Sequence, residues 1–82
     1  MVSQPGDAHR FTMSRNHVLI LGIFTDHQGK SFTVSQIRVM LLVLNVDIPP
    51  GQVRSCLHDL FVLGRLTRIK SSHIFRYRIT GQ

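Results

Sequence analysis

The most concentrated set of chemically capable side chains lies near the C-terminal end and is basic. Six basic residues occur there with no acid between them: Arg65, Arg68, Lys70, His73, Arg76 and Arg78. Such a density of like charge is repulsive unless an anion lies nearby, and cations that neutralise phosphates release condensed counterions. The segment therefore predicts contact with nucleic-acid phosphates or with a minor groove.

The chain as a whole is also basic, with ten Lys and Arg, four Asp, no Glu and a formal net charge of +6. A membrane surface would attract this charge too, but the cations concentrate in a strand-like segment and not on an amphipathic helix. The apolar runs are too short for a membrane span, and the first twelve residues lack the apolar core of a signal peptide. We expect double-stranded DNA as the partner, no membrane contact, and a cytoplasmic or nucleoid-associated location, or a nuclear one in a eukaryote.

The residue types that enzymes and metal sites need are scattered along the chain. The four aspartates stand apart, and no glycine-rich phosphate loop is present. Cys56 and His58 lack two further ligands at metal-site spacing, and Cys56 falls beside an apolar helical stripe that suits a small buried hydrophobe. We therefore predict no enzyme activity, no metal, no cofactor and no small-molecule substrate.

Capping signals and helical periodicity predict two helices in the first half of the chain. Ser14 is a plausible N-cap for a helix over residues 15–24, and Thr33 with Gln36 forms a capping box for a second helix over residues 34–44. The expected core positions of the second helix recur at helical spacing. They are Val34, Ile37, Met40, Leu41 and Leu44.

A third helix and a hairpin follow. Pro50 suits the first turn of a helix over residues 50–63, and Gly64 suits its left-handed end. Its expected inward face is Val53, Leu57, Leu60 and Phe61. Beyond Gly64 apolar residues alternate with Arg76 and Arg78, which predicts strands over residues 65–70 and 75–79, a turn at 71–73, and arginines gathered on one side.

This order of elements resembles the winged helix-turn-helix family over residues 14–80. The resemblance is carried by Val53-x3-Leu57-x2-Leu60-x3-Gly64-x-Leu66-x-Arg68 and by the run from Phe75 to Thr80. It implies an α+β, mainly α fold, with three helices and a C-terminal two-stranded β-hairpin wing over residues 14–82. Residues 1–13 are polar and without periodicity, so we expect a flexible arm there. One departure is Pro49-Pro50-Gly51, where related domains usually offer Ser or Thr.

In this family the third helix enters the major groove, so the resemblance implies a division of labour among polar residues. The expected recognition-helix contacts are Gln52, Arg54, Ser55 and His58, with Arg54 the expected reader of a guanine edge. The second helix would touch the DNA backbone through Ser35, Gln36 and Arg38. The basic residues of the wing complete the expected interface.

The first two helices carry more apolar surface than one small core needs. Five side chains are expected to point away from that core: Val18, Leu19, Val39, Leu42 and Val43. Such a patch favours a homodimer, which would pair two DNA half-sites. The alternative is that the two helices wrap each other more fully and bury these residues.

These observations favour a small transcriptional regulator that acts by occupying its DNA site. Two alternatives remain open. One is a winged-helix protein-interaction module that uses the apolar face of the first two helices, and the other is an architectural or replication-associated DNA binder of low specificity.

Overall fold

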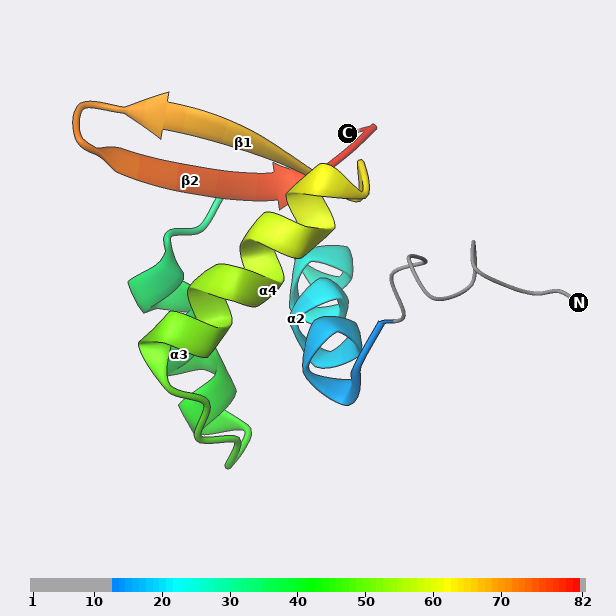
Figure 1. The fold of residues 1–82 in the computed structure, drawn as a ribbon, viewed down its shortest axis with the longest axis vertical. Coiled ribbons are helices and arrows are strands. Elements are labelled where there is room, and N and C mark those ends of the chain that lie inside the picture. The colour runs from blue at the N-terminus through cyan, green and yellow to red at the C-terminus, as the bar shows by residue number, and fades with distance from the viewer. Residues whose placement is uncertain (1–12, 82) are drawn as a thin grey trace, which may run out of the picture.

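The computed structural model describes residues 13–81, in which three helices precede one antiparallel hairpin. The elements are α2 (Arg15–Asp26), α3 (Val34–Val43), α4 (Pro50–Val62), β1 (Leu66–Ser71) and β2 (Ile74–Ile79). The predicted arm at 1–13 lies outside the described residues except for Met13, which packs against the core. Figure 1 shows the hairpin crossing the C-terminal end of α4, with α2 and α3 packed along that helix.

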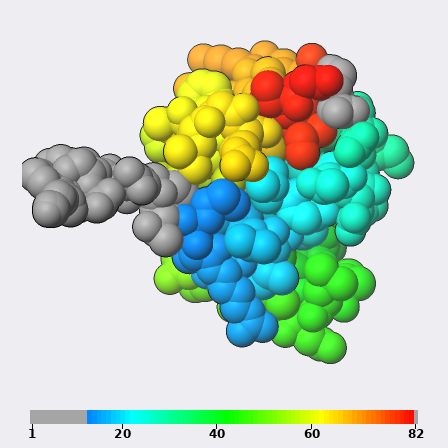
Figure 2. Space-filling model, turned by 90° about the vertical axis from the view of Figure 1, so that its right-hand side faces the viewer, coloured from blue at the N-terminus to red at the C-terminus, as the bar shows by residue number. Residues whose placement is uncertain are grey.

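Helix α2 starts at the predicted cap. The backbone N–H of His17 donates to Ser14 Oγ (3.4 Å), and the backbone N–H of Ser14 donates to His17 Nδ1 (3.1 Å). These reciprocal bonds satisfy two donors that a helix start leaves without partners. The helix continues to Asp26, two residues past its predicted end. In Figure 2, α2 lies across the face nearest the viewer, between the end of α4 and α3.

Helix α3 begins at the predicted capping box. Gln36 N–H donates to Thr33 Oγ1 (3.2 Å), and Thr33 N–H donates to Gln36 Oε1 (2.9 Å). The helix ends at Val43, and Asn45 then adopts a left-handed φ of 63°. The prediction that Leu44 faces the core is wrong, because the chain has already left the helix and 57% of Leu44 is exposed.

Helix α4 forms as predicted from Pro50. It ends at Val62 with Leu63 as its cap, and Gly64 follows at a φ of 80°, the conformation that its lack of a Cβ permits. Val53, Leu57 and Leu60 are fully buried.

The hairpin turns through two residues, Ser72 and His73, and this sets its register. Arg68 stands opposite Tyr77 and Lys70 opposite Phe75, whereas Arg76 and Arg78 stand opposite Ile69 and Thr67. Residues directly opposite each other point to the same side of a sheet. The prediction that the arginines gather on one side is therefore wrong, because Arg68 shares the aromatic side and Arg76 and Arg78 take the other.

A short bridge that the sequence did not indicate extends this sheet. Phe32 N–H donates to the Tyr77 carbonyl (2.8 Å), and Tyr77 N–H donates to the Phe32 carbonyl (2.9 Å). The ring of Phe32 also meets Phe24 edge-on, with centroids 5.6 Å apart. These contacts attach the segment before α3 to the middle of β2.

The core lies where the three helices meet the base of the hairpin. Its fully buried side chains include Ile20, Phe24, Ile37, Leu41 and Leu60. Leu19 also packs against this core, so its predicted outward position is wrong: the broad apolar face of α2 includes it. Val18, Val39, Leu42 and Val43 are exposed, as predicted. Within residues 13–81, no helix is long and apolar enough to cross a membrane.

Stability should depend on the inward face of α4. We predict that Leu57→Ala lowers the free energy of unfolding by about 2–5 kcal/mol, because a fully buried side chain leaves a cavity. Leu63→Ala, just past the helix and exposed, should cost less than about 1 kcal/mol. Urea denaturation of both variants checks this, and equal losses would contradict the packing described here.

Candidate nucleic-acid interface

A groove of about 680 Å³ lies between α4, the start of α3 and the hairpin. It brings together six of the residues predicted for DNA contact, although they come from two helices and two parts of the hairpin. Ser35 belongs to α3; Arg54, Ser55 and His58 belong to α4; Arg68 belongs to β1 and His73 to the turn. The groove lining therefore combines hydroxyls and basic side chains with apolar ones such as Val34, Ile74 and Phe75.

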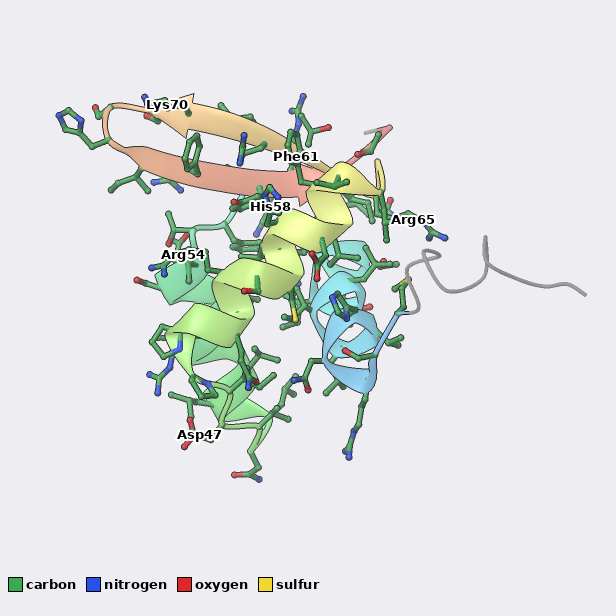
Figure 3. The ribbon with its side chains drawn as sticks, viewed as in Figure 1. Asp47, Arg54, His58, Phe61, Arg65 and Lys70 are labelled. Carbon is green, nitrogen blue, oxygen red and sulfur yellow. The ribbon has the colours of Figure 1, made fainter. Side chains whose placement is uncertain are left out.

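The outward face of α4 supplies the near wall of the groove. Arg54, Ser55 and His58 are exposed, and the residues between them in sequence turn inward because the helix repeats every 3.6 residues. Figure 3 shows His58 beneath the hairpin and Arg54 nearer the start of α4. Gln52 is exposed too, but it is not part of the groove lining.

Arg68 joins the hairpin to α4 by stacking. Its guanidinium carbon lies 4.3 Å from the ring centroid of Phe61 on α4 and 4.5 Å from that of Phe75 on β2. Stacking holds the plane of a guanidinium, and its N–H groups lie at the edge of that plane. Arg68 is thus a fixed cation whose donors are suited to a phosphate in the groove.

Among the described residues that line the groove, Asp59 is the only acid. Its Oδ2 lies 2.9 Å from Nε2 of His17 on α2. Because His17 Nδ1 accepts from the Ser14 backbone, we assign the ring proton to Nε2, which donates to Asp59. This bond turns the carboxylate towards α2 and satisfies part of its hydrogen-bonding capacity.

His17 is the residue that sequence reasoning missed. Its spacing from the other histidines does not indicate a metal site. The available signal was Ser14-x-x-His17, which has capping-box spacing with His in place of the usual Glu or Gln. Its pairing with Asp59, 42 positions away, has no local signature.

Two of the predicted α3 residues are engaged elsewhere. Arg38 donates to the carbonyl of Ile48 (3.3 Å) and pairs with Asp47 (3.4 Å). Asp47 lies at the end of the molecule remote from the hairpin (Figure 3). Gln36 caps its own helix and borders a second, smaller apolar groove beside Val39.

The remaining basic residues of the hairpin lie outside the groove lining. Figure 3 places Arg65 at the base of the hairpin, on the opposite side of the molecule from Arg54, and Lys70 near the turn. Lys70 Nζ lies 6.0 Å from the centroid of Phe75. Arg76 and Arg78 occupy the other side of the hairpin from Arg68.

Cys56 is buried, as predicted for a small hydrophobe. Burial, and then the negative charge of Asp59, raise the pKa of its thiol above the usual value. A raised pKa disfavours the thiolate, the form that attacks electrophiles and binds metals. In the part of the chain that the structure describes, no three His, Cys, Asp or Glu side chains are grouped as a metal site would require.

Comparison with solved structures identifies the fold. No family model and no curated protein sequence matches the chain. The structure is similar to that of a ferric uptake regulator from Francisella tularensis, solved with iron, with a TM-score of 0.80 and 17% sequence identity. The match covers 99% of this chain and 59% of that one, so the chain spans less than two thirds of its neighbour's length. Three helices followed by a hairpin therefore form a winged-helix fold, which confirms the predicted fold class.

The contact between His17 and Asp59 should support the fold. We predict that His17→Ala lowers the free energy of unfolding by about 1–3 kcal/mol, because it removes the capping acceptor of α2 and the partner of Asp59. His58→Ala, at an exposed position of α4, should change it by no more than about 0.5 kcal/mol. If thermal or urea unfolding does not distinguish the variants, His17 does not have this structural role.

Proposed function

We propose that this protein binds double-stranded DNA without catalysis, with α4 in the major groove and the wing, residues 66–79, on the adjacent backbone. The observation that carries the proposal is the groove between α4 and the wing, where Arg54, His58, Arg68 and His73 converge from separate elements. Against these basic groups the lining has one acid, Asp59, which is bonded to His17.

The dimensions of DNA suit this arrangement. A major groove about 12 Å wide admits one α-helix, and one phosphate backbone separates it from the neighbouring minor groove. With α4 in the major groove, that backbone would run through the groove beneath the wing. Arg68 would then donate to a phosphate from its stacked position.

The proposed contacts divide into reading and positioning. Arg54 would bond a guanine edge in the major groove, with Gln52, Ser55 and His58 beside it. Ser35, Arg68, Lys70 and His73 would hold the backbone, because hydroxyls and cations on phosphate fix orientation without reading sequence. Basic residues outside the groove would add to the positive field that attracts DNA. They are Arg38, Arg65, Arg76 and Arg78. Gln36 would keep only its role as a cap of α3.

Regulation of transcription by occupancy is the biological role that we propose. The winged-helix neighbour is named a regulator, which supports this role for a DNA-binding chain of the same fold. A bound protein would exclude other proteins from the same stretch of DNA.

The exposed apolar stripe of α3 supports association of two copies. Val39, Leu42 and Val43 are spaced so that they share one side of the helix, and 77% of Val43 is exposed. Figure 1 shows the end of α3 on the side of the molecule away from the hairpin. A dimer formed through this stripe would leave both wings available for DNA. Val18 on α2 is exposed as well.

Binding should fall with salt and depend on the groove. On a plot of log affinity for duplex DNA against log salt concentration, we expect a slope of about −0.9 for each phosphate contacted. Arg54→Ala should cost about 1–3 kcal/mol on preferred sequences and relax preference at one base pair, whereas Arg68→Ala should weaken all duplexes alike. Fluorescence anisotropy on sequences selected from random duplexes measures both effects.

Arg15→Ala is the matched control, since it removes the same charge from α2 outside the groove. An equal loss in all three variants would mean that only net charge matters and would refute the assigned roles. Absence of duplex binding by the unaltered protein at low salt would refute the proposed function.

Association through α3 is tested by Leu42→Glu. We expect the unaltered protein to sediment as a dimer and the variant as a monomer, because a charge buried in an apolar interface has no partner. Val62→Glu, at an exposed position of α4, should remain dimeric. If the unaltered protein sediments as a monomer at every concentration, the dimer is excluded. Capture of another protein by the same stripe would favour the alternative of a winged-helix protein-interaction module.

A further inference from the structure

The tip of the wing carries apolar side chains that the fold does not bury. Leu66 at the base of the hairpin and Tyr77 in the middle of β2 are almost completely covered. At the tip, 54% of Ile74 and 41% of Phe75 are exposed, and Ile69 is exposed as well. The hairpin therefore changes along its length from a core element into an exposed apolar projection.

We propose that Ile74 is a wedge that enters the minor groove of duplex DNA and partly unstacks one base-pair step. The proposal rests on the proposed function, because it takes the DNA to lie in the groove between α4 and the wing. Apolar side chains at such positions open base steps and bend the duplex towards the major groove. The class of ligand is duplex DNA with easily unstacked pyrimidine–purine steps.

The two exposed residues of β2 have different surroundings. Phe75 is held on one side by the guanidinium of Arg68, 4.5 Å from its ring centroid. Ile74 comes directly after the turn and borders the groove, and its pairing with Ser71 places it on the Arg76 side of the hairpin, away from the stack of Arg68 on Phe75. Ile74 is therefore the residue available for insertion, and the stack of Arg68 on Phe75 supports it from behind.

The charges around the tip favour DNA as the occupant. Lys70 and His73 lie beside the apolar residues, and Arg76 is the next basic residue along β2. Cations on both sides of an inserted side chain can bond the phosphates of the two strands that border a minor groove. A flat anionic membrane offers its charges on one side only, whereas here Arg68 and Arg76 point to opposite sides of the hairpin.

The rigidity of the hairpin suits insertion. Its turn is the shortest that joins two antiparallel strands, with Ser72 at a φ of 56°, and Phe32 bonds to the middle of β2. A wedge must transmit force to the base stack without bending away. The bridge at Phe32 and the stack at Arg68 both anchor the hairpin to the helices.

The test uses the full chain and a short A·T-rich duplex with 2-aminopurine at TA steps. The fluorescence of this base rises when it loses its stacking neighbours, and the anisotropy of a dye on the same duplex reports occupancy. At saturation we expect fluorescence to rise at least about twofold with the unaltered protein. Ile74→Ser, matched for occupancy, should abolish the rise, and Ile74→Leu should retain it.

Val62→Ser is the matched control, because Val62 is exposed on α4 and is not part of the groove lining. It should give the same rise as the unaltered protein. We expect Ile74→Ser to change affinity by less than about fivefold, since the lost contact is offset by the unstacking that no longer occurs. Circular dichroism checks that every variant is folded.

Three results would overturn the wedge while leaving DNA binding intact. They are saturated duplex without a rise in fluorescence, an undiminished rise with Ile74→Ser, and loss of the rise with Val62→Ser. Absence of any anisotropy change would overturn the proposed function together with the wedge. Sedimentation with phosphatidylserine vesicles in preference to duplex DNA would show that the tip inserts into a membrane.

Discussion

Helix α4 is the element on which the rest of the structure depends, because α2, α3 and β1 all pack against it. Its buried residues Val53, Leu57 and Leu60 provide the centre of the core, and the residues between them form one wall of the candidate interface. The same helical period sets both faces. A rotation of α4 that exposed Leu57 would also move Arg54 and His58 out of the groove, so packing fixes where these side chains project.

The stacking of Arg68 extends this constraint to the wing. Phe61 comes from α4 and Phe75 from β2, so a guanidinium between them relates the hairpin to the helix. The same residue contributes charge to the groove, which links the stability of the wing to its proposed contact with phosphate. On α4, which forms the facing wall of the groove, the hydrogen bond from His17 to Asp59 lessens the repulsion between this carboxylate and an anion. Both arrangements would favour the proposed binding of an anion in the groove.

The parts of this fold that could be predicted from the sequence are those with local physical causes. Thr33 and Gln36 are three positions apart, and the side chain of each accepts a hydrogen bond from the backbone N–H of the other. Gly64 ends a helix because it accepts a positive φ. The register of the hairpin has no such local signal. It depends on the length of the turn, and a turn of two residues instead of three decides which side of the sheet Arg68 takes. The bonds of His17 to Asp59 and of Phe32 to Tyr77 join residues far apart in sequence. Such pairings follow from the completed packing, and no periodicity indicates them.

The types of residue that line the candidate groove could be predicted from the sequence, but which individual residues line it could not. The outward face of α4 follows from helical geometry once Val53 and Leu57 are placed inward, so Arg54 and His58 could be named in advance. Arg38 could not be excluded in the same way, because its partner Asp47 lies in the connection after α3. The groove thus selects among cations that the sequence presents as equivalent. Charge density alone predicts attraction to DNA, whereas the direction in which each cation is held decides whether it can read a base, hold a phosphate or do neither.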